Sequence, residues 1–217
     1  MFVKQNALVV MYHYVYESRD SSPDGIRPLF LDEFEEQLDW LQENFEIVSP
    51  GDFLQGIKAS QSASTKPRCM LTFDDGTKDH WEVVAPALQR RSLTGLFFIL
   101  TWPTQRQKMP VTHALHWLLG HSEDQIWKEL ESYAEANLGG IDALVAEEEV
   151  SRLYHSHNEP GVRGLIKYAV NFGMPTDAVE GVIAKLAESR GQRLDQLAGR
   201  WFMSEQQIKQ LSDSGME

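Results

Sequence analysis

The stretch Leu71-Thr72-Phe73-Asp74-Asp75-Gly76-Thr77 decides the fold. Its apolar part, together with the Cys-Met pair before it, is typical of a strand that is buried on both faces in a parallel sheet. The strand ends at two acids and a glycine, where the backbone turns and side chains reach solvent. Adjacent carboxylates repel each other unless a cation or a proton lies between them. Because α/β proteins place their sites at the carboxyl ends of parallel strands, Asp74 and Asp75 form the candidate site.

Strand patterns alternate with helix patterns over the first hundred residues. The predicted strands cover residues 7–14, 45–48, 69–73 and 95–100. The first predicted helix has Asp32 as its N-cap, with Glu35 three residues later as in a capping box, and two more follow at 50–58 and 79–91. Strands that alternate with helices predict an α/β fold with a parallel sheet and right-handed crossovers.

The pattern changes to helices alone between residues 105 and 199. Ser122 and Gln125 form a capping box ahead of an apolar stripe, and another helix is predicted at 142–154. The stripe consists of Ile126, Leu130, Tyr133, Ala134 and Leu138. Ser204 and Gln207 then predict the start of a further helix. A helical insertion of this length is expected to lie over the carboxyl ends of the strands as a lid or substrate wall.

At Thr72-Phe73-Asp74-Asp75-Gly76 the chain resembles the first motif of the polysaccharide deacetylases, the NodB-homology domain of carbohydrate esterase family 4. Residues 8–15 are similar to the opening strand of members with an extra N-terminal strand, and residues 34–41 to the helix after it. Residues 84–99 resemble the next helix and strand. The resemblance covers residues 7–100 and resumes near Trp201.

The resemblance implies a partial NodB-type distorted (β/α) barrel with a large all-helical insertion. Residues 1–100 would form the first part of the barrel, 101–200 the helical insertion or lid, and 201–217 the barrel helix that leads to the next strand. In the family that strand carries a His-Ser/Thr-x-x-His motif. We therefore expect a chain truncated before this motif, and inactive as it stands.

The function implied is that of a metal-dependent hydrolase that removes acetyl groups from N-acetylated amino sugars. By this resemblance Asp75 binds the divalent metal, zinc foremost and cobalt or nickel as alternatives, and Asp74 is the catalytic base. His13 and Tyr12 would line the site or contact the substrate. His80, at the start of a predicted helix, is expected to have a capping or surface role.

Two further histidine pairs invite a metal assignment. His113 and His116 lie three residues apart on a predicted helix, and His155 and His157 flank a serine in a polar segment. Neither pair has the spacing or the strand context of the family's own pair. We predict that none of these four side chains is a metal ligand.

Two alternatives remain open. Asp75-Gly76-Thr77 is similar to part of the Asp-x-Asp-Gly-Thr motif of haloacid-dehalogenase-like phosphatases, but Phe73 occupies the position of the nucleophilic aspartate. The second alternative is a non-catalytic carbohydrate-binding or regulatory relative that lacks the metal site. Metal content distinguishes the three readings: a zinc-like ion, magnesium or none.

Composition limits the partners and the compartment. The 217 residues carry a formal net charge of −12, which argues against nucleic acid and against anionic membrane surfaces. The single cysteine, Cys69, is predicted to be a small core residue. No secretory signal or membrane-spanning stretch is recognised, so a cytoplasmic protein is expected. The open edge of an incomplete sheet predicts self-association.

Overall fold

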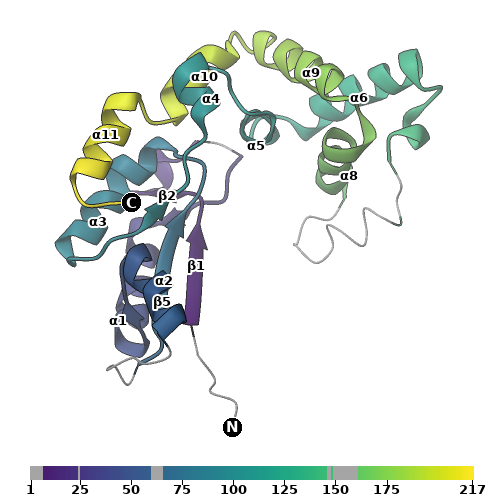
Figure 1. Cartoon of the computed structure of the whole chain (residues 1–217). Coiled ribbons are helices and arrows are strands. Elements are labelled where there is room, and N and C mark those ends of the chain that lie inside the picture. Colours follow the sequence, from purple (N-terminus) through teal and green to yellow (C-terminus); the bar gives the residue numbers. More distant parts are fainter. Residues whose placement is uncertain (1–6, 24, 60–65, 146–147, 149–160) are drawn as a thin grey trace. The chain divides into compact units, whose positions relative to one another are not determined.

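The computed structural model describes residues 7–23, 25–59, 66–145, 148 and 161–217 (Figure 1). The chain divides into two compact units. Unit 1 comprises Met1–Ser22, Arg27–Lys108 and Ala198–Glu217, and unit 2 comprises Pro23–Ile26 and Met109–Leu197. These bounds lie close to the division expected at residues 100 and 200, and the role of unit 2 as a lid stays a prediction.

Unit 1 contains a four-stranded parallel sheet whose central strand is β5 (Arg68–Phe73). β1 (Ala7–Tyr12) lies along one side of β5 (Figure 1). In this parallel pair Tyr12 is opposite Phe73. On the other side, β4 (Glu46–Ile47) pairs with the start of β5 and β6 (Leu96–Phe97) with its end. Five of the six residues of β5 are buried, as a strand enclosed on both faces requires. The prediction of an α/β fold with a parallel sheet is confirmed, whereas the closed barrel stays a prediction.

Three predicted strands are shorter in the structure, and β4 covers only two of the residues predicted at 45–48. The first strand ends at Tyr12 rather than at residue 14, and a separate two-residue strand, β2 (Val15–Tyr16), pairs with β3 (Leu29–Phe30). β6 is two residues long, although a strand over 95–100 was predicted. The Phe98 amide still donates to the carbonyl of Phe73, the last residue of β5, at 2.8 Å. Beyond it the Leu100 amide donates to Asp75 in the loop after β5, so the regular ladder has ended.

The last residues of the chain lie beside β6. The Glu217 amide donates to the carbonyl of Gly95 at 3.1 Å, and the Phe97 amide donates to the carbonyl of Glu217 at 2.7 Å. Glu217 thus bonds to the residue before Leu96 and to the residue after it, which is the hydrogen-bond pattern of two parallel strands. Glu217 therefore lies alongside β6 in the direction of a parallel neighbour.

Seven helical segments accompany the sheet in the described part of unit 1. They are α1 (Leu31–Asn44), α2 (Pro50–Ala59), the π-helical η2 (His80–Val84), α3 (Ala85–Arg90), α4 (Thr101–Arg106), the end of α10 (Leu194–Trp201), and α11 (Glu205–Asp213). The apolar face of α1 buries Phe34, Leu38 and Leu41 in the core that β5 also enters. The capping box at Ser204 is confirmed: the Gln207 amide donates to its hydroxyl, and Gln207 Oε1 accepts from the Ser204 amide. A short 3-10 turn, η1 (Arg19–Ser21), precedes β3.

The predicted start of α1 is wrong by two residues. The helix begins at Leu31, and Glu33 rather than Glu35 reaches back to the chain, accepting a hydrogen bond from the Phe30 amide at 3.0 Å. Asp32 lies in the first turn, where its carboxylate accepts from the Glu33 amide. An acid in this turn is favourable because the amino end of a helix carries partial positive charge.

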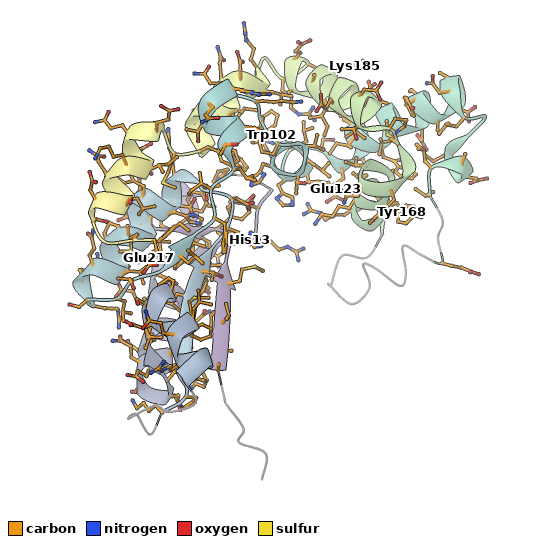
Figure 2. All side chains as sticks on the ribbon, viewed as in Figure 1. His13, Trp102, Glu123, Tyr168, Lys185 and Glu217 are labelled. Carbon is orange, nitrogen blue, oxygen red and sulfur yellow. The ribbon has the colours of Figure 1, made fainter. Side chains whose placement is uncertain are left out.

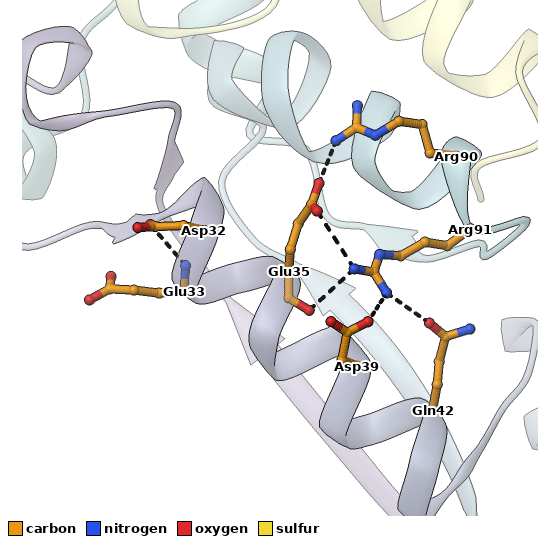
Figure 3. A network of polar contacts seen from close by, with 7 residues as sticks. All are labelled: Asp32, Glu33, Glu35, Asp39, Gln42, Arg90 and Arg91. Carbon is orange, nitrogen blue, oxygen red and sulfur yellow. Dashed lines mark hydrogen bonds and ion pairs between the residues drawn. The ribbon is translucent and has the colours of Figure 1, made fainter.

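A polar network ties α1 to the end of α3 (Figure 3). Arg90 lies 2.5 Å from the carboxylate of Glu35, and Arg91 bonds to Asp39 and donates to Gln42 at 3.1 Å. Bonding to Asp39 is the main reason that the pKa of Arg91 is raised. Because these bonds join α1 to the end of α3, we assign the network to structure rather than to a ligand.

All the regular secondary structure in the described part of unit 2 is helical. Its elements are α5 (Val111–Leu119), α6 (Glu123–Asn137), η3 (Ile141–Ala143), α8 (Val162–Tyr168), the π-helical η5 (Ala169–Gly173), α9 (Thr176–Glu188) and the start of α10. The Ser122 cap is confirmed, since its hydroxyl accepts from the Gln125 amide. Ile126, Leu130 and Ala134 are buried as predicted, but Leu138 is exposed because α6 ends before it. Most of the helix predicted at 142–154 lies outside the described residues.

No helix in the described part of the chain combines the length and the apolar character needed to cross a membrane. Cys69 is fully buried in β5, as predicted. Burial raises the pKa of its thiol to about 11.

Candidate functional site

Asp74, Asp75 and Gly76 form a loop at the carboxyl end of β5, which we call the acid loop. The Asp74 amide donates to the carbonyl of Tyr12 at 3.0 Å, which ties the loop to the end of β1. On the other side, the Leu100 amide donates to the carbonyl of Asp75 at 3.3 Å. Asp75 has φ of 79° and Gly76 has φ of 75°, so two successive residues adopt the left-handed conformation. For a residue with a side chain this conformation is strained, and such strain is typical of functional sites.

His13 lies beside the acid pair, as the topology of parallel neighbours predicts. It follows the last residue of β1, and its Nδ1 donates to Oδ2 of Asp75 at 3.1 Å. The side chain of His13 is 48% exposed and that of Asp75 23%. Figure 2 shows His13 at the end of β1. A carboxylate and an imidazole are thus joined at a place that a ligand can reach.

Asp79 and His80 lie behind this pair, and sequence reasoning missed both. His80 is fully buried and Asp79 is 2% exposed, so the predicted surface role of His80 is wrong. Nε2 of His80 lies 2.7 Å from the carbonyl oxygen of His13, and Oδ2 of Asp79 accepts from the Val15 amide at 2.8 Å. The one available signal was the position of both residues just after the acid loop.

Tyr12 contributes its backbone rather than its ring to the site. The ring is stacked on Phe73 at 5.4 Å between centroids and meets Phe34 edge-on at 5.1 Å. Its hydroxyl donates to Gln37 at 3.2 Å, and burial raises the pKa of Tyr12 to about 12. The side chain therefore belongs to the core, and only the carbonyl reaches the acid loop.

Tyr14 is a partly buried tyrosine near two carboxylates of this region, those of Asp75 and Asp79. Burial raises its pKa, and the negative charges of Asp75 and Asp79 raise it further. Its ring meets that of Trp201 edge-on at 6.5 Å between centroids. The carboxylates thus set up a negative potential around the end of β1, which favours a cation there.

An apolar segment follows β6 beside the acid loop. Phe98, Leu100 and Trp102 are exposed in alternating positions, and Trp102 has 59% of its surface accessible. Figure 2 labels Trp102. The bond from the Leu100 amide to Asp75 attaches this segment directly to the site. Lys108 places its ammonium group 5.9 Å from the centre of the Trp102 ring.

The other histidine pairs lie apart from this loop in sequence. His113 and His116 belong to α5 of unit 2, with ring centroids 6.3 Å apart, and His113 is buried. His155 and His157 lie outside the described residues. That none of the four is a metal ligand stays a prediction.

The described residues fit a metal ion only in part. A catalytic zinc site generally has three protein ligands and an open position. Asp75 offers an oxygen donor. The His13 nitrogen that lies 3.1 Å from it, Nδ1, carries the hydrogen of their hydrogen bond and would have to lose that hydrogen before it could bind an ion. Among the residues with described positions, no group of three or more His, Cys, Asp or Glu side chains is arranged to hold a metal. Any further donors would have to come from solvent or from other parts of the protein.

The phosphatase alternative finds no support at this site. Phe73 occupies the position that the phosphatase motif reserves for its nucleophilic aspartate. It is fully buried and stacked on Phe97, with 4.7 Å between ring centroids. An apolar ring in the core cannot attack a phosphate.

Solved structures of deacetylases are similar to this chain. A de-N-acetylase from Aggregatibacter actinomycetemcomitans has 18% identity and a TM-score of 0.39, over 49% of this chain and 40% of that chain. The deacetylase PplD from Streptococcus pyogenes, solved in complex with acetate, has 15% identity and a TM-score of 0.40, over 83% of this chain and 80% of that chain. BC0361, a polysaccharide deacetylase from Bacillus cereus, has 14% identity and a TM-score of 0.36, over 55% and 41%. The match thus spans less than half the length of the de-N-acetylase and of BC0361.

No protein-family model matches the chain, and no curated protein sequence matches it.

Proposed function

We propose that this chain carries the acid pair of a metal-dependent hydrolase that removes acetyl groups from N-acetylated amino sugars. The observation that carries the proposal is the pairing of Asp75 with His13, at 3.1 Å, beside Asp74 at the end of the central parallel strand. On this proposal the four parallel strands form the first part of a NodB-type barrel.

The two acids have different parts in the proposed reaction. Asp74 accepts a proton from the attacking water as general base, and the protonated Asp74 then gives this proton to the nitrogen that leaves as the amine. The water oxygen bonds to the acetyl carbon, the C–N bond breaks, and acetate and the free amine are released. Asp75 stays ionised, with its orientation fixed by the hydrogen bond from His13.

A divalent ion at Asp75, zinc foremost and cobalt or nickel as alternatives, would polarise the amide carbonyl and acidify water. Asp75 suits an ion because its carboxylate is partly exposed and lies next to a second carboxylate. The repulsion between the two acids would fall once a cation neutralised one of them.

The surroundings of the acid loop suit an amino sugar. Binding sites combine apolar walls with a few polar groups, and Phe98, Leu100 and Trp102 offer an apolar wall beside Asp75. The negative potential there disfavours anionic substrates and is compatible with a neutral acetamide and a cationic amine product.

Acetate release from an N-acetylated amino-sugar oligomer tests the proposal. The 217-residue chain is incubated with zinc or cobalt, with and without free imidazole, which can supply nitrogen donors that the described residues lack. Without imidazole we expect weak metal binding and no steady release. With imidazole we expect release in proportion to protein, abolished in both Asp75→Ala and Asp74→Asn. Release that survives Asp75→Ala would overturn the proposal.

A second candidate is a non-catalytic carbohydrate-binding or regulatory relative. It is favoured by the lack of a three-residue metal group among the described residues. This candidate predicts that the oligomer binds, in a manner that depends on Trp102, while no acetate appears with any metal and imidazole combination. Such a result would replace the hydrolase proposal.

A further inference from the structure

The segment that carries His13 lies between two strands and is held by a buried pair of side chains. β1 ends at Tyr12 and β2 begins at Val15, so His13 lies outside the regular sheet. Two hydrogen bonds fix the segment from behind. His80 bonds to the carbonyl of His13 at 2.7 Å, and Asp79 accepts from the Val15 amide at 2.8 Å.

The bond to the His13 carbonyl determines which ring nitrogen of His80 carries a hydrogen. A carbonyl oxygen only accepts, so Nε2 of His80 carries the hydrogen and donates. The ring is locked in place by two aromatic neighbours, with centroids 5.8 Å from that of Phe73 and 5.8 Å from that of Phe97. A donor held in this way presents its N–H to one place, the carbonyl of His13.

The pair is costly for the core to keep. Among the described residues, no hydrogen-bond partner is found for Oδ1 of Asp79 or for Nδ1 of His80. A buried polar atom left unpaired costs about 1–3 kcal/mol. Apolar residues of similar size would avoid this cost if packing were the only requirement. The polar groups are therefore explained by what they bond, which is the backbone on both sides of Tyr14.

The local helix geometry is consistent with this task. η2 begins at His80 as a π-helix, a wider turn that occurs often at functional sites. It follows the acid loop by three residues, and the His80 amide donates to the Thr77 carbonyl at 3.1 Å. One short stretch of chain thus carries Asp75 and also holds the backbone of its partner, His13.

We propose that Asp79 and His80 are positioning residues that hold the His13 backbone so that its imidazole meets Asp75. The significance of this for catalysis rests on the proposed function, whereas the positioning itself does not. Removing the His80 donor releases the carbonyl of His13, and the imidazole then loses its fixed approach to the carboxylate.

The test is the ¹⁵N resonance of His13 Nδ1, measured by NMR without metal at one fixed pH. Asp75→Ala provides the resonance of an unpaired His13. We expect His80→Leu to move the Nδ1 resonance to the Asp75→Ala position, and His80→Gln, which keeps an N–H donor, to restore the wild-type position. His121→Gln is the matched control, since His121 also bonds a backbone carbonyl, that of Trp117, at 2.8 Å. It should leave the resonance unchanged.

A folded His80→Leu variant with the wild-type His13 resonance would overturn the proposal. Where His80→Leu does not fold, Asp79→Ala gives the second reading, because it removes the acceptor of the Val15 amide. In that variant we expect faster exchange of the Val15 amide together with a shifted His13 resonance, and an unshifted resonance would again contradict the proposal. Because no metal or substrate is present, the outcome does not depend on whether the chain deacetylates sugars.

Discussion

The left-handed backbone conformation of Asp75 predicts which substitutions at this position are the more stable. At φ of 79°, a residue with a side chain pays about 1–2 kcal/mol that glycine avoids. Glycine in turn loses about 0.5–1 kcal/mol more backbone entropy on folding than alanine. Both substitutions remove the hydrogen bond from His13, so that loss cancels in their comparison. We therefore expect Asp75→Gly to be more stable than Asp75→Ala by about 1 kcal/mol.

Asp74 is the matched control, because its φ is not among the positive values of the described residues. There the order should reverse, with Asp74→Gly less stable than Asp74→Ala by about 0.5–1 kcal/mol. Since the chain has two compact units, hydrogen exchange of the buried Leu71 amide in β5 is the suitable assay, as it reports on unit 1. Equal stabilities at Asp75, or alanine above glycine there, would refute the reasoning.

Two further predictions concern the core. Because the pKa of the Cys69 thiol is raised to about 11 in the folded chain, the thiol ionises first in the unfolded chain as pH rises. The free energy of unfolding should therefore fall between about pH 9 and pH 11, by about 2–3 kcal/mol more than in Cys69→Ala. Urea unfolding at several pH values checks this, and parallel curves for the two proteins would contradict it. A Cβ on Gly95 would lie 2.6 Å from the ring of Phe73, so Gly95→Ala should cost about 1–3 kcal/mol. Gly181→Ala in α9, where a Cβ has nothing within 4 Å, should instead gain about 0.5–1 kcal/mol, and two losses of similar size would count against the packing argument.

The sequence predicted the elements whose signal is continuous. The apolar run before Asp74 has one explanation, a strand buried on both faces, and β5 is such a strand. Once strands and helices alternate, parallel neighbours end at the same edge, which brings His13 to Asp75 without any knowledge of distances. The N-caps at Ser122 and Ser204 were predictable because a cap depends on residues within one turn. In the described part of the chain, the second, reciprocal bond of the predicted capping box is found at Ser204 but not at Ser122.

The missed features depend on contacts between distant parts of the chain. His80 was expected to have a capping or surface role because polar residues usually begin a helix on its solvent side, and Asp79 was considered only as the first residue of that predicted helix. Their partners, the backbone at His13 and Val15, lie 67 and 64 residues away in sequence, so no local pattern reveals them. Tyr12 was assigned to the site by the resemblance, but side-chain alternation along β1 turns its ring toward α1, where its hydroxyl meets Gln37.

The central claim is that Asp75 holds the metal and Asp74 moves the proton. Cobalt binding, followed by its visible absorption with free imidazole present, tests it most directly, because the two variants should separate. We predict that Asp75→Ala loses the cobalt spectrum, whereas Asp74→Asn keeps it and loses acetate release, since ligation needs the anion and proton transfer needs the base. Equal loss of cobalt in both variants, or an unchanged spectrum in Asp75→Ala, would contradict the account.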